Sequence, residues 1–178
     1  MDILPTLHTG ALSVVCAPHA AREAVAELAA ALALRGALTV LDGGNRFQPY
    51  RVAQLLRQYT AQVDSAAKRL FIRRAFTCYQ MLALLEDTPA LRQPYIILDL
   101  LGTFYDEHVN EREARRLLGA CLLQVERLCQ LAPVVVTLAP PLVAERAFLL
   151  DLVCLRAERV LRHESPSLTF QQPVLFAL

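Results

Sequence analysis

The sequence predicts an α/β fold in which a mainly parallel sheet is flanked by helices. Short apolar segments alternate along the whole chain with longer segments that have a helical period. Most of the short segments contain at most one polar residue, which is typical of parallel strands covered on both faces. No apolar run reaches the roughly 18 residues that a membrane-spanning helix needs. The 178 residues contain no linker, so we expect one domain spanning 1–178 and no membrane partner.

The first elements follow from apolar runs and their end signals. Residues 11–16 are apolar with one small polar position, and they predict a buried strand. Residues 22–35 carry apolar side chains at helical spacing and stop before Gly36, a common residue just after a helix. Residues 37–41 predict a second strand that ends at Asp42.

The middle of the chain predicts two helices and a strand. Pro49 suits the first turn of a helix, because its φ is fixed near the helical value and it lacks the N–H that a helix start leaves unpaired. Residues 68–76 predict the third strand. Thr77 can cap a short helix that continues to Glu86.

The last third begins with the clearest strand, residues 94–99, which is apolar until its terminal Asp99. Asn110 can cap a long helix whose apolar positions keep a helical period. Residues 133–138 predict a Val-rich fifth strand. Three further segments are predicted as shorter strands, antiparallel at one edge of the sheet: 148–155, 159–163 and 174–178.

Composition limits the partners of the chain. The net charge of +1 gives no overall field that favours nucleic acid. The five cysteines have no CxxC spacing, so we expect buried thiols in a reducing cytoplasm and no metal site. The N-terminus lacks the features of a signal peptide, which also predicts a cytoplasmic location. The apolar fraction of 55% predicts a surface that another protein, or a second copy, covers.

The connection after the first strand lies where nucleotide-binding α/β folds place their phosphate loop. Such a loop needs glycines, whose flexible backbone lets consecutive N–H groups face an anion, and a lysine followed by serine or threonine. Residues 17–24 have no glycine, lysine or hydroxyl, and they include a proline and a glutamate. The scaffold of an NTPase is therefore predicted without its phosphate loop.

Several segments, in order, resemble the RecA/RadA-type recombinases. Residues 41–51 read Leu-Asp-Gly-Gly-Asn-Arg-Phe-Gln-Pro-Tyr-Arg. From Asp42 onward this segment is similar to the family segment Asp-Thr-Glu-Gly-x-Phe-x-Pro-x-Arg. Residues 71–77 resemble the strand that follows, and 95–99 resemble the second nucleotide motif with its metal-supporting aspartate. Residues 100–108 resemble the segment with the first DNA loop. The resemblance implies a RecA-like three-layer fold and a role in DNA recombination or repair, or in signalling as in KaiC-type ATPases.

Departures from the family pattern imply that catalysis is lost. Gly44 stands where the family has its catalytic glutamate, so no carboxylate there can orient an attacking water. The strand over 133–138 ends without the polar residue that senses the γ-phosphate. We therefore expect a RecA-like pseudo-ATPase without a cofactor, which acts as an interaction protein. Its expected partner is an active RecA-like relative or a second copy.

The degenerate nucleotide site is expected to contain His19, Arg22, Asp42 and Asp99. Each has a structural alternative: His19 can form a simple turn, Asp42 can stabilise the turn after its strand, and Asp99 can accept local backbone N–H groups. In an alternative function, the chain still binds and hydrolyses ATP, with Arg22 replacing the lysine and Asp99 supporting Mg²⁺.

A third candidate function is direct DNA binding through clustered arginines. Two groups could contact phosphates: Arg69, Arg73 and Arg74 around the third strand, and Arg112, Arg115 and Arg116 on the long helix. Glutamates lie close by in the sequence, so an ion-paired surface is the structural alternative.

Overall fold

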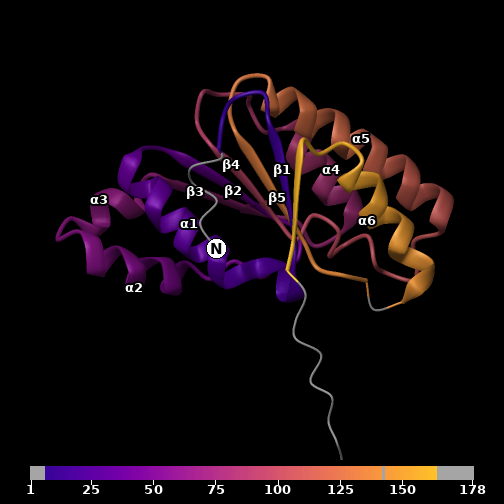
Figure 1. Ribbon diagram of the computed structural model, residues 1–178, viewed down its shortest axis with the longest axis horizontal. Helices are drawn as coiled ribbons and strands as arrows, with labels where there is room; N and C mark the ends of the chain where they lie inside the picture. Colours follow the sequence, from indigo (N-terminus) through magenta and orange to yellow (C-terminus); the bar gives the residue numbers. More distant parts are fainter. Residues whose placement is uncertain (1–6, 142, 164–178) are drawn as a thin grey trace, which may run out of the picture.

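The computed structural model describes residues 7–141 and 143–163 and confirms an α/β architecture. Six strands form one sheet in the order β3-β2-β4-β5-β1-β6, and every neighbouring pair within the described residues is parallel. Helices cover both faces of this sheet (Figure 1). The carboxyl ends of all strands consequently meet at one end of the sheet, where α/β folds bind their ligands.

The elements alternate along the chain, with one helix or helix pair between consecutive strands. The strands are β1 (Leu12–Cys16), β2 (Leu38–Asp42), β3 (Leu70–Arg74), β4 (Tyr95–Leu98), β5 (Val134–Leu138) and β6 (Arg159–Arg162). The helices are α1 (Arg22–Arg35), α2 (Pro49–Tyr59), α3 (Val63–Ala67), α4 (Cys78–Glu86), α5 (Glu111–Cys129) and α6 (Ala147–Cys154), with short 3-10 segments η2 (Pro18–Ala21) and η3 (Ala144–Arg146). The elements predicted before residue 139 are confirmed, and α3 is an addition to them.

The sheet separates two hydrophobic cores. Helices α1, α2 and α3 pack on one face, and α4, α5 and α6 pack on the other (Figure 1). The central strand β4 serves both cores: Ile96 and Leu98 belong to the first and Ile97 to the second, and all three are fully buried. This two-sided burial explains why β4 is apolar along its whole length.

Helix caps predicted from the sequence are present. The Thr77 hydroxyl accepts the N–H of Gln80 at 3.1 Å at the start of α4. The Asn110 side chain accepts the N–H of Glu113 at 2.9 Å at the start of α5. Each bond satisfies one donor that the first helical turn leaves unpaired.

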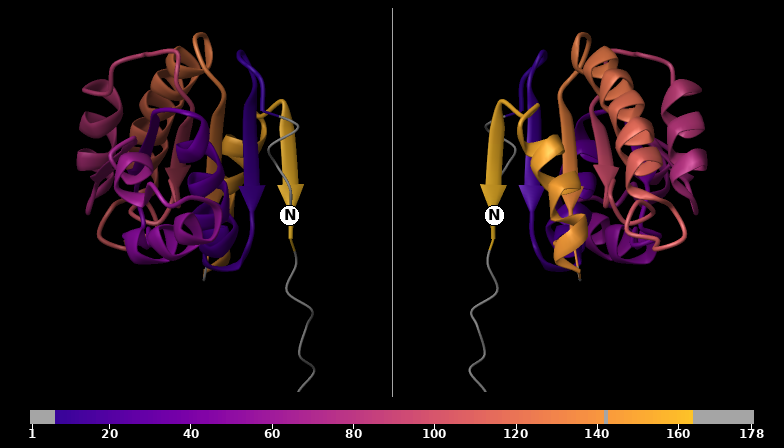
Figure 2. Two further views of the ribbon diagram at one scale, coloured as in Figure 1. Left: turned by 90° about the vertical axis from the view of Figure 1, so that its left-hand side faces the viewer. Right: turned by 90° about the vertical axis from the view of Figure 1, so that its right-hand side faces the viewer.

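The predictions for the C-terminal part are wrong in two respects. Residues 148–155, predicted as a strand, lie mostly in helix α6, where Leu149 and Val153 are four residues apart and share the buried face. Strand β6 is parallel to β1, not antiparallel, because α6 carries the chain back across the sheet before β6 begins. Figure 2 shows β6 at the edge of the sheet. The strand predicted over 174–178 lies outside the described residues.

Candidate nucleotide site

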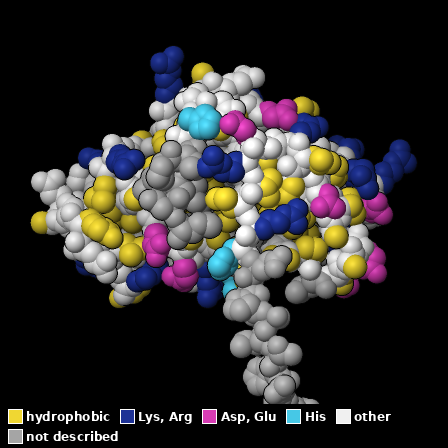
Figure 3. All heavy atoms as spheres, viewed as in Figure 1, with side chains coloured by type: hydrophobic (Ala, Val, Ile, Leu, Met, Phe, Trp, Pro, Cys, Tyr) yellow, Lys and Arg dark blue, Asp and Glu magenta, His cyan; other side chains and the backbone are white. Residues whose placement is uncertain are grey.

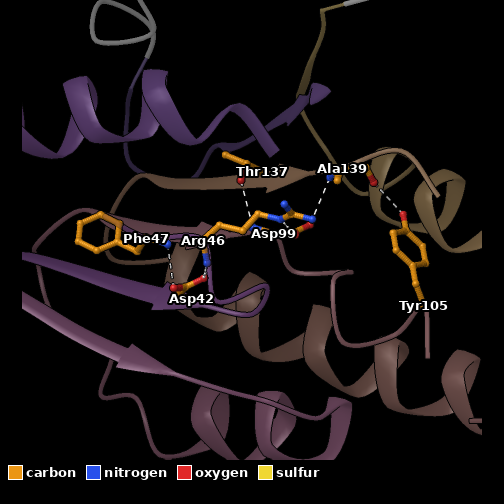
Figure 4. Close-up of polar contacts among 7 residues, drawn as sticks. All are labelled: Asp42, Arg46, Phe47, Asp99, Tyr105, Thr137 and Ala139. Carbon is orange, nitrogen blue, oxygen red and sulfur yellow. Dashed lines mark hydrogen bonds and ion pairs between the residues drawn. The ribbon is translucent and has the colours of Figure 1, made fainter. Parts of the chain in front are cut away.

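Asp99, directly after β4, is fully buried and engaged by protein donors on both carboxylate oxygens (Figure 4). Its Oδ2 forms an ion pair with Nε of Arg46. Its Oδ1 accepts the N–H of Ala139 at 3.3 Å, and its own N–H donates to the Thr137 hydroxyl at 3.1 Å. The residue has a φ of 52°, in the left-handed region, which turns its side chain back over the strand ends.

Glycines pack closely around this carboxylate. A Cβ added to Gly44 would overlap Oδ2 of Asp99, and a Cβ on Gly102 would lie 2.9 Å from the same oxygen. A Cβ on Gly43 would lie 2.8 Å from the Asp99 carbonyl oxygen. Any side chain at position 44 therefore conflicts with the present place of Asp99, so the glycine that replaces the expected catalytic glutamate is required by the packing.

Asp42, at the end of β2, fixes the turn that carries Arg46. It is fully buried, and its Oδ1 accepts the N–H of Arg46 at 3.0 Å while Oδ2 accepts the N–H of Phe47 at 2.9 Å (Figure 4). Nε of Arg74 lies 3.3 Å from the same Oδ2. Asp42 thus has the structural role that its strand-end position allowed, and it holds the backbone of Arg46 so that the guanidinium reaches Asp99.

The loop after β5 is held from two sides. The N–H of Ala139 donates to Asp99, and its carbonyl oxygen accepts the hydroxyl of Tyr105 at 2.9 Å (Figure 4). Burial raises the pKa of Tyr105, and the nearby charge of Asp99 raises it further, so the phenol stays protonated and donates. The loop after β5 is therefore fixed by contacts with the protein's own groups.

The connection between β1 and α1 contains a left-handed turn. His19, Ala20 and Ala21 have φ values of 53°, 53° and 54°, a conformation that costs roughly 1–2 kcal/mol for each residue with a Cβ. Two backbone hydrogen bonds hold its start, since the N–H of Ala17 donates to the Leu138 carbonyl and the N–H of Ala20 to the Ala17 carbonyl, each at 3.0 Å. The turn leads directly into α1.

A pocket of about 500 Å³ lies beside this turn and the start of α1. Its lining includes His19, Arg22 and His163, but also the carboxylates of Glu23 and Glu27. Glu23 lies 3.4 Å from Nε of Arg51 and 3.9 Å from Nε of Arg22. Glu23 in the first turn of α1, with Glu27 in the second, opposes the anion that the helix dipole would otherwise attract.

The four residues of the predicted site therefore fall into two groups. His19 and Arg22 line the pocket at the start of α1, whereas Asp42 and Asp99 hold the Arg46 turn. Sequence reasoning missed Arg46 as a site residue, although it lies in the segment similar to the RecA/RadA family. The available signal was a single arginine two residues after a Gly-Gly turn, between two strands that each end in an aspartate.

Most of the candidate DNA-binding arginines are held by other protein groups. Arg69 Nη1 donates to the carbonyls of Ala33 and Leu34 at the end of α1. The remaining pairs are Arg73–Asp87 at 3.7 Å, Arg74–Asp42 at 3.3 Å, Arg115–Glu111 at 3.0 Å and Arg116–Glu113 at 2.7 Å. Arg112 is exposed on the same helix as the last two. On the face shown in Figure 3, basic and acidic side chains are interspersed.

Comparison of the sequence with models of protein families and with curated proteins finds no match. Among residues 7–141 and 143–163, no helix is long and apolar enough to cross a membrane. In the same part of the chain, no three His, Cys, Asp or Glu side chains come together as metal ligands.

Proposed function

We propose that this protein is a RecA-like domain that does not hydrolyse nucleotides and acts through contacts with another protein, in the context of DNA recombination or repair. The observation that carries this proposal is the Arg46–Asp99 ion pair. Mg²⁺ supported by Asp99 would need carboxylate oxygens that Arg46 and Ala139 now occupy. An arginine in this place also supplies the positive charge that a metal would bring.

The pocket at the start of α1, where phosphates would lie, also supports the proposal. Pro18 has no N–H to offer, and Glu23 and Glu27 line the pocket in which phosphates would lie. Two N–H groups here already have protein partners, since Ala17 donates to the Leu138 carbonyl and Ala20 to the Ala17 carbonyl. Both ends of a bound Mg–nucleotide would therefore meet protein groups that oppose it.

The open edge of strand β3 supports a role in protein contacts. Within the part of the chain that the structure describes, β3 pairs with β2 alone, and four of its five residues are exposed. Large apolar side chains stand at or near this edge, with exposed fractions of 55% for Phe71, 66% for Phe76 and 54% for Tyr79. An exposed apolar edge strand can pair with an extended segment of another chain, so proteins usually cover such edges.

The register indicates which backbone groups are available for such an added strand. The N–H of Leu38 donates to the Arg69 carbonyl, and the N–H of Ala75 donates to the Asp42 carbonyl. Residues of β3 at odd numbers therefore face β2, because the direction of these groups alternates along a parallel strand. The backbone groups of Leu70, Ile72 and Arg74 face the open edge.

Charge favours a different protein over a second copy as the partner. Residues 68–74 contain four basic side chains, at positions 68, 69, 73 and 74, on either side of three apolar residues. Arg73 and Arg74 are each paired with an aspartate, so the unbalanced charge of this segment lies at Lys68 and Arg69. Two copies of the strand would bring these like charges together, which destabilises a strand pair. The complementary segment is extended and apolar, with acidic residues at the end that meets Lys68 and Arg69.

Calorimetric titration of the full chain with ATP and Mg²⁺ tests the loss of nucleotide binding. We expect no saturable heat at millimolar ATP. Binding in the micromolar range would contradict the proposal, and its loss in Arg22→Ala would then favour the alternative in which Arg22 replaces the phosphate-loop lysine.

Affinity capture from the source cell tests the role in protein contacts. The full chain and its Phe71→Glu variant serve as baits, with Leu123→Glu as the matched control, because Leu123 on α5 has a similar exposed fraction of 59%. We expect a RecA-like protein bound by the wild type and the control and lost from Phe71→Glu. Equal capture by all three would contradict β3 as the contact edge.

A further inference from the structure

Two cysteines distant in the sequence lie next to each other at the carboxyl end of the sheet. Cys16 ends β1 and Cys154 ends α6, and their Sγ atoms are 3.8 Å apart across 138 sequence positions. Cys16 is buried, whereas Cys154 is partly exposed. One thiol is thus within reach of solvent and the other lies directly behind it.

The backbone on both sides of this pair is well anchored. Cys16 is paired with Leu138 of β5 on one side and with Arg162 of β6 on the other, and its carbonyl accepts the N–H of His163 at 2.8 Å. The end of α6 is closed by the N–H of Leu155, which donates to the Asp151 carbonyl at 2.9 Å. The two sulfurs are therefore held in proximity by the fold.

We propose that Cys16 and Cys154 form an oxidation site that a peroxide converts reversibly into an intramolecular disulfide. A covalent S–S bond is about 2.05 Å long, so the sulfurs must approach by roughly 1.8 Å. Both atoms lie on the same side of the sheet, on the core that α6 covers, so side-chain rotation brings them together without crossing a strand. This site is independent of the proposed function, because it involves neither the Arg46 turn nor β3.

The chemistry proceeds in two balanced steps. The Cys154 thiolate attacks one oxygen of hydrogen peroxide, the O–O bond breaks, and the departing hydroxide takes a proton to become water, which leaves a sulfenic acid. The Cys16 sulfur then attacks the Cys154 sulfur, the S–O bond breaks, and hydroxide leaves with the Cys16 proton as a second water. The two sulfurs lose two electrons, which reduce the peroxide.

The environment assigns these separate roles to the two thiols. Burial, together with the neighbouring Cys154, raises the pKa of Cys16 to about 12, although the charge of Arg162 acts in the opposite direction. Cys16 therefore stays protonated until a sulfenic acid forms beside it. Cys154, as the more exposed sulfur, meets the peroxide first.

A disulfide between Cys16 and Cys154 would connect α6 covalently to β1, the strand that leads into the left-handed turn. Ala17, the next residue after Cys16, lines the pocket at the start of α1 together with His163. Oxidation would therefore add a covalent link between α6 and β1 directly beside one wall of this pocket.

Peptide mass spectrometry of the full chain tests the site. The reduced protein is treated with hydrogen peroxide, remaining thiols are alkylated, and the protein is digested without reductant. We expect a cross-link between the peptides that contain Cys16 and Cys154, with the loss of two hydrogens, and its disappearance after treatment with dithiothreitol. Cys154→Ala should lose the cross-link, and Cys129→Ala, which removes a buried cysteine elsewhere, should retain it.

Two outcomes would overturn the proposal. One is oxidation of Cys154 to the sulfinic or sulfonic acid while Cys16 remains free to alkylate, and the other is a cross-link between two chains. The wild-type peptide map decides between these results without relying on a variant that folds poorly. A urea titration adds a second measurement: the oxidised wild type should unfold at a higher urea midpoint than the reduced form, and an unchanged midpoint would contradict closure of the long loop.

Discussion

The Arg46–Asp99 ion pair shows where residue-level prediction from sequence succeeds and where it stops. Asp42 and Asp99 are recognisable because each ends an apolar strand. Their common partner Arg46 is not, because the contact depends on β2 and β4 being neighbours in the sheet. No local pattern of residues encodes that order. The structural roles of both aspartates were among the alternatives that the sequence left open.

Removing Arg46 should destabilise the protein. Arg46→Ala leaves Asp99, which is fully buried, without its cationic partner. Because the Arg46 side chain is itself 34% exposed, solvent screens part of this pair, and we expect a loss of about 1–3 kcal/mol. Urea unfolding at neutral pH measures the loss. The control is Arg57→Ala on the exposed side of α2, where we expect a change below about 0.5 kcal/mol. Similar losses in both variants would show that the pair contributes little.

Two glycines should respond in opposite directions to the same substitution. Gly44→Ala forces a Cβ against the Asp99 carboxylate, so we expect a marked fall in the melting temperature. Gly119→Ala in the middle of α5 meets no heavy atom within 4 Å and should stabilise the helix by about 0.5–1 kcal/mol. Calorimetric melting of both variants is the measurement. A stable Gly44→Ala would refute the close packing around Asp99.

At the scale of elements, helix α6 explains why the C-terminal prediction was wrong. The segment is almost entirely apolar and short, so a buried strand and a buried helix have the same appearance in sequence. Its direction also determined the orientation of β6, since a helix between two strands makes them parallel. The earlier elements were predictable because glycine, proline and capping residues mark their ends.

The left-handed turn before α1 allows us to predict how glycine substitutions there change the free energy of unfolding. Ala21 has a φ of 54°, where glycine has no steric penalty, whereas Ala24 lies in the first turn of the helix. Ala21→Gly should therefore leave the free energy of unfolding unchanged or raise it, and Ala24→Gly should lower it by about 0.5–1 kcal/mol. Thermal unfolding of the two variants, both at half-buried positions, provides the comparison. Equal destabilisation would argue against a left-handed Ala21.

At the scale of the whole molecule, the alternation of strands and helices was enough to predict a mainly parallel sheet with helices on both faces. The strand order was not predictable from the residues alone, because it depends on which crossovers return the chain to the centre. Cys16 and Cys154 lie close together because of that strand order. Their scattered positions in the sequence give no sign of it.

The charge distribution of the whole molecule predicts weak DNA binding. The net charge is +1, and Arg115 and Arg116 are paired with glutamates of the same helix. Fluorescence anisotropy with a labelled single-stranded oligonucleotide should show no saturable binding at about 50 mM salt, where phosphate contacts are strongest. Tight binding that falls steeply with salt, and that is lost in the double variant Arg115→Ala, Arg116→Ala, would instead support the DNA-binding alternative.

The packing of Gly44 against Asp99 also bears on how such a chain can evolve. A carboxylate at position 44 and the present place of Asp99 exclude each other sterically, so a glutamate cannot be gained there while the Arg46 pair persists. Losing the pair first exposes the intermediate to an unbalanced interior charge. On the proposed function, each single step towards hydrolysis would therefore lower the stability of the protein, and no one substitution would restore the catalytic carboxylate without that loss.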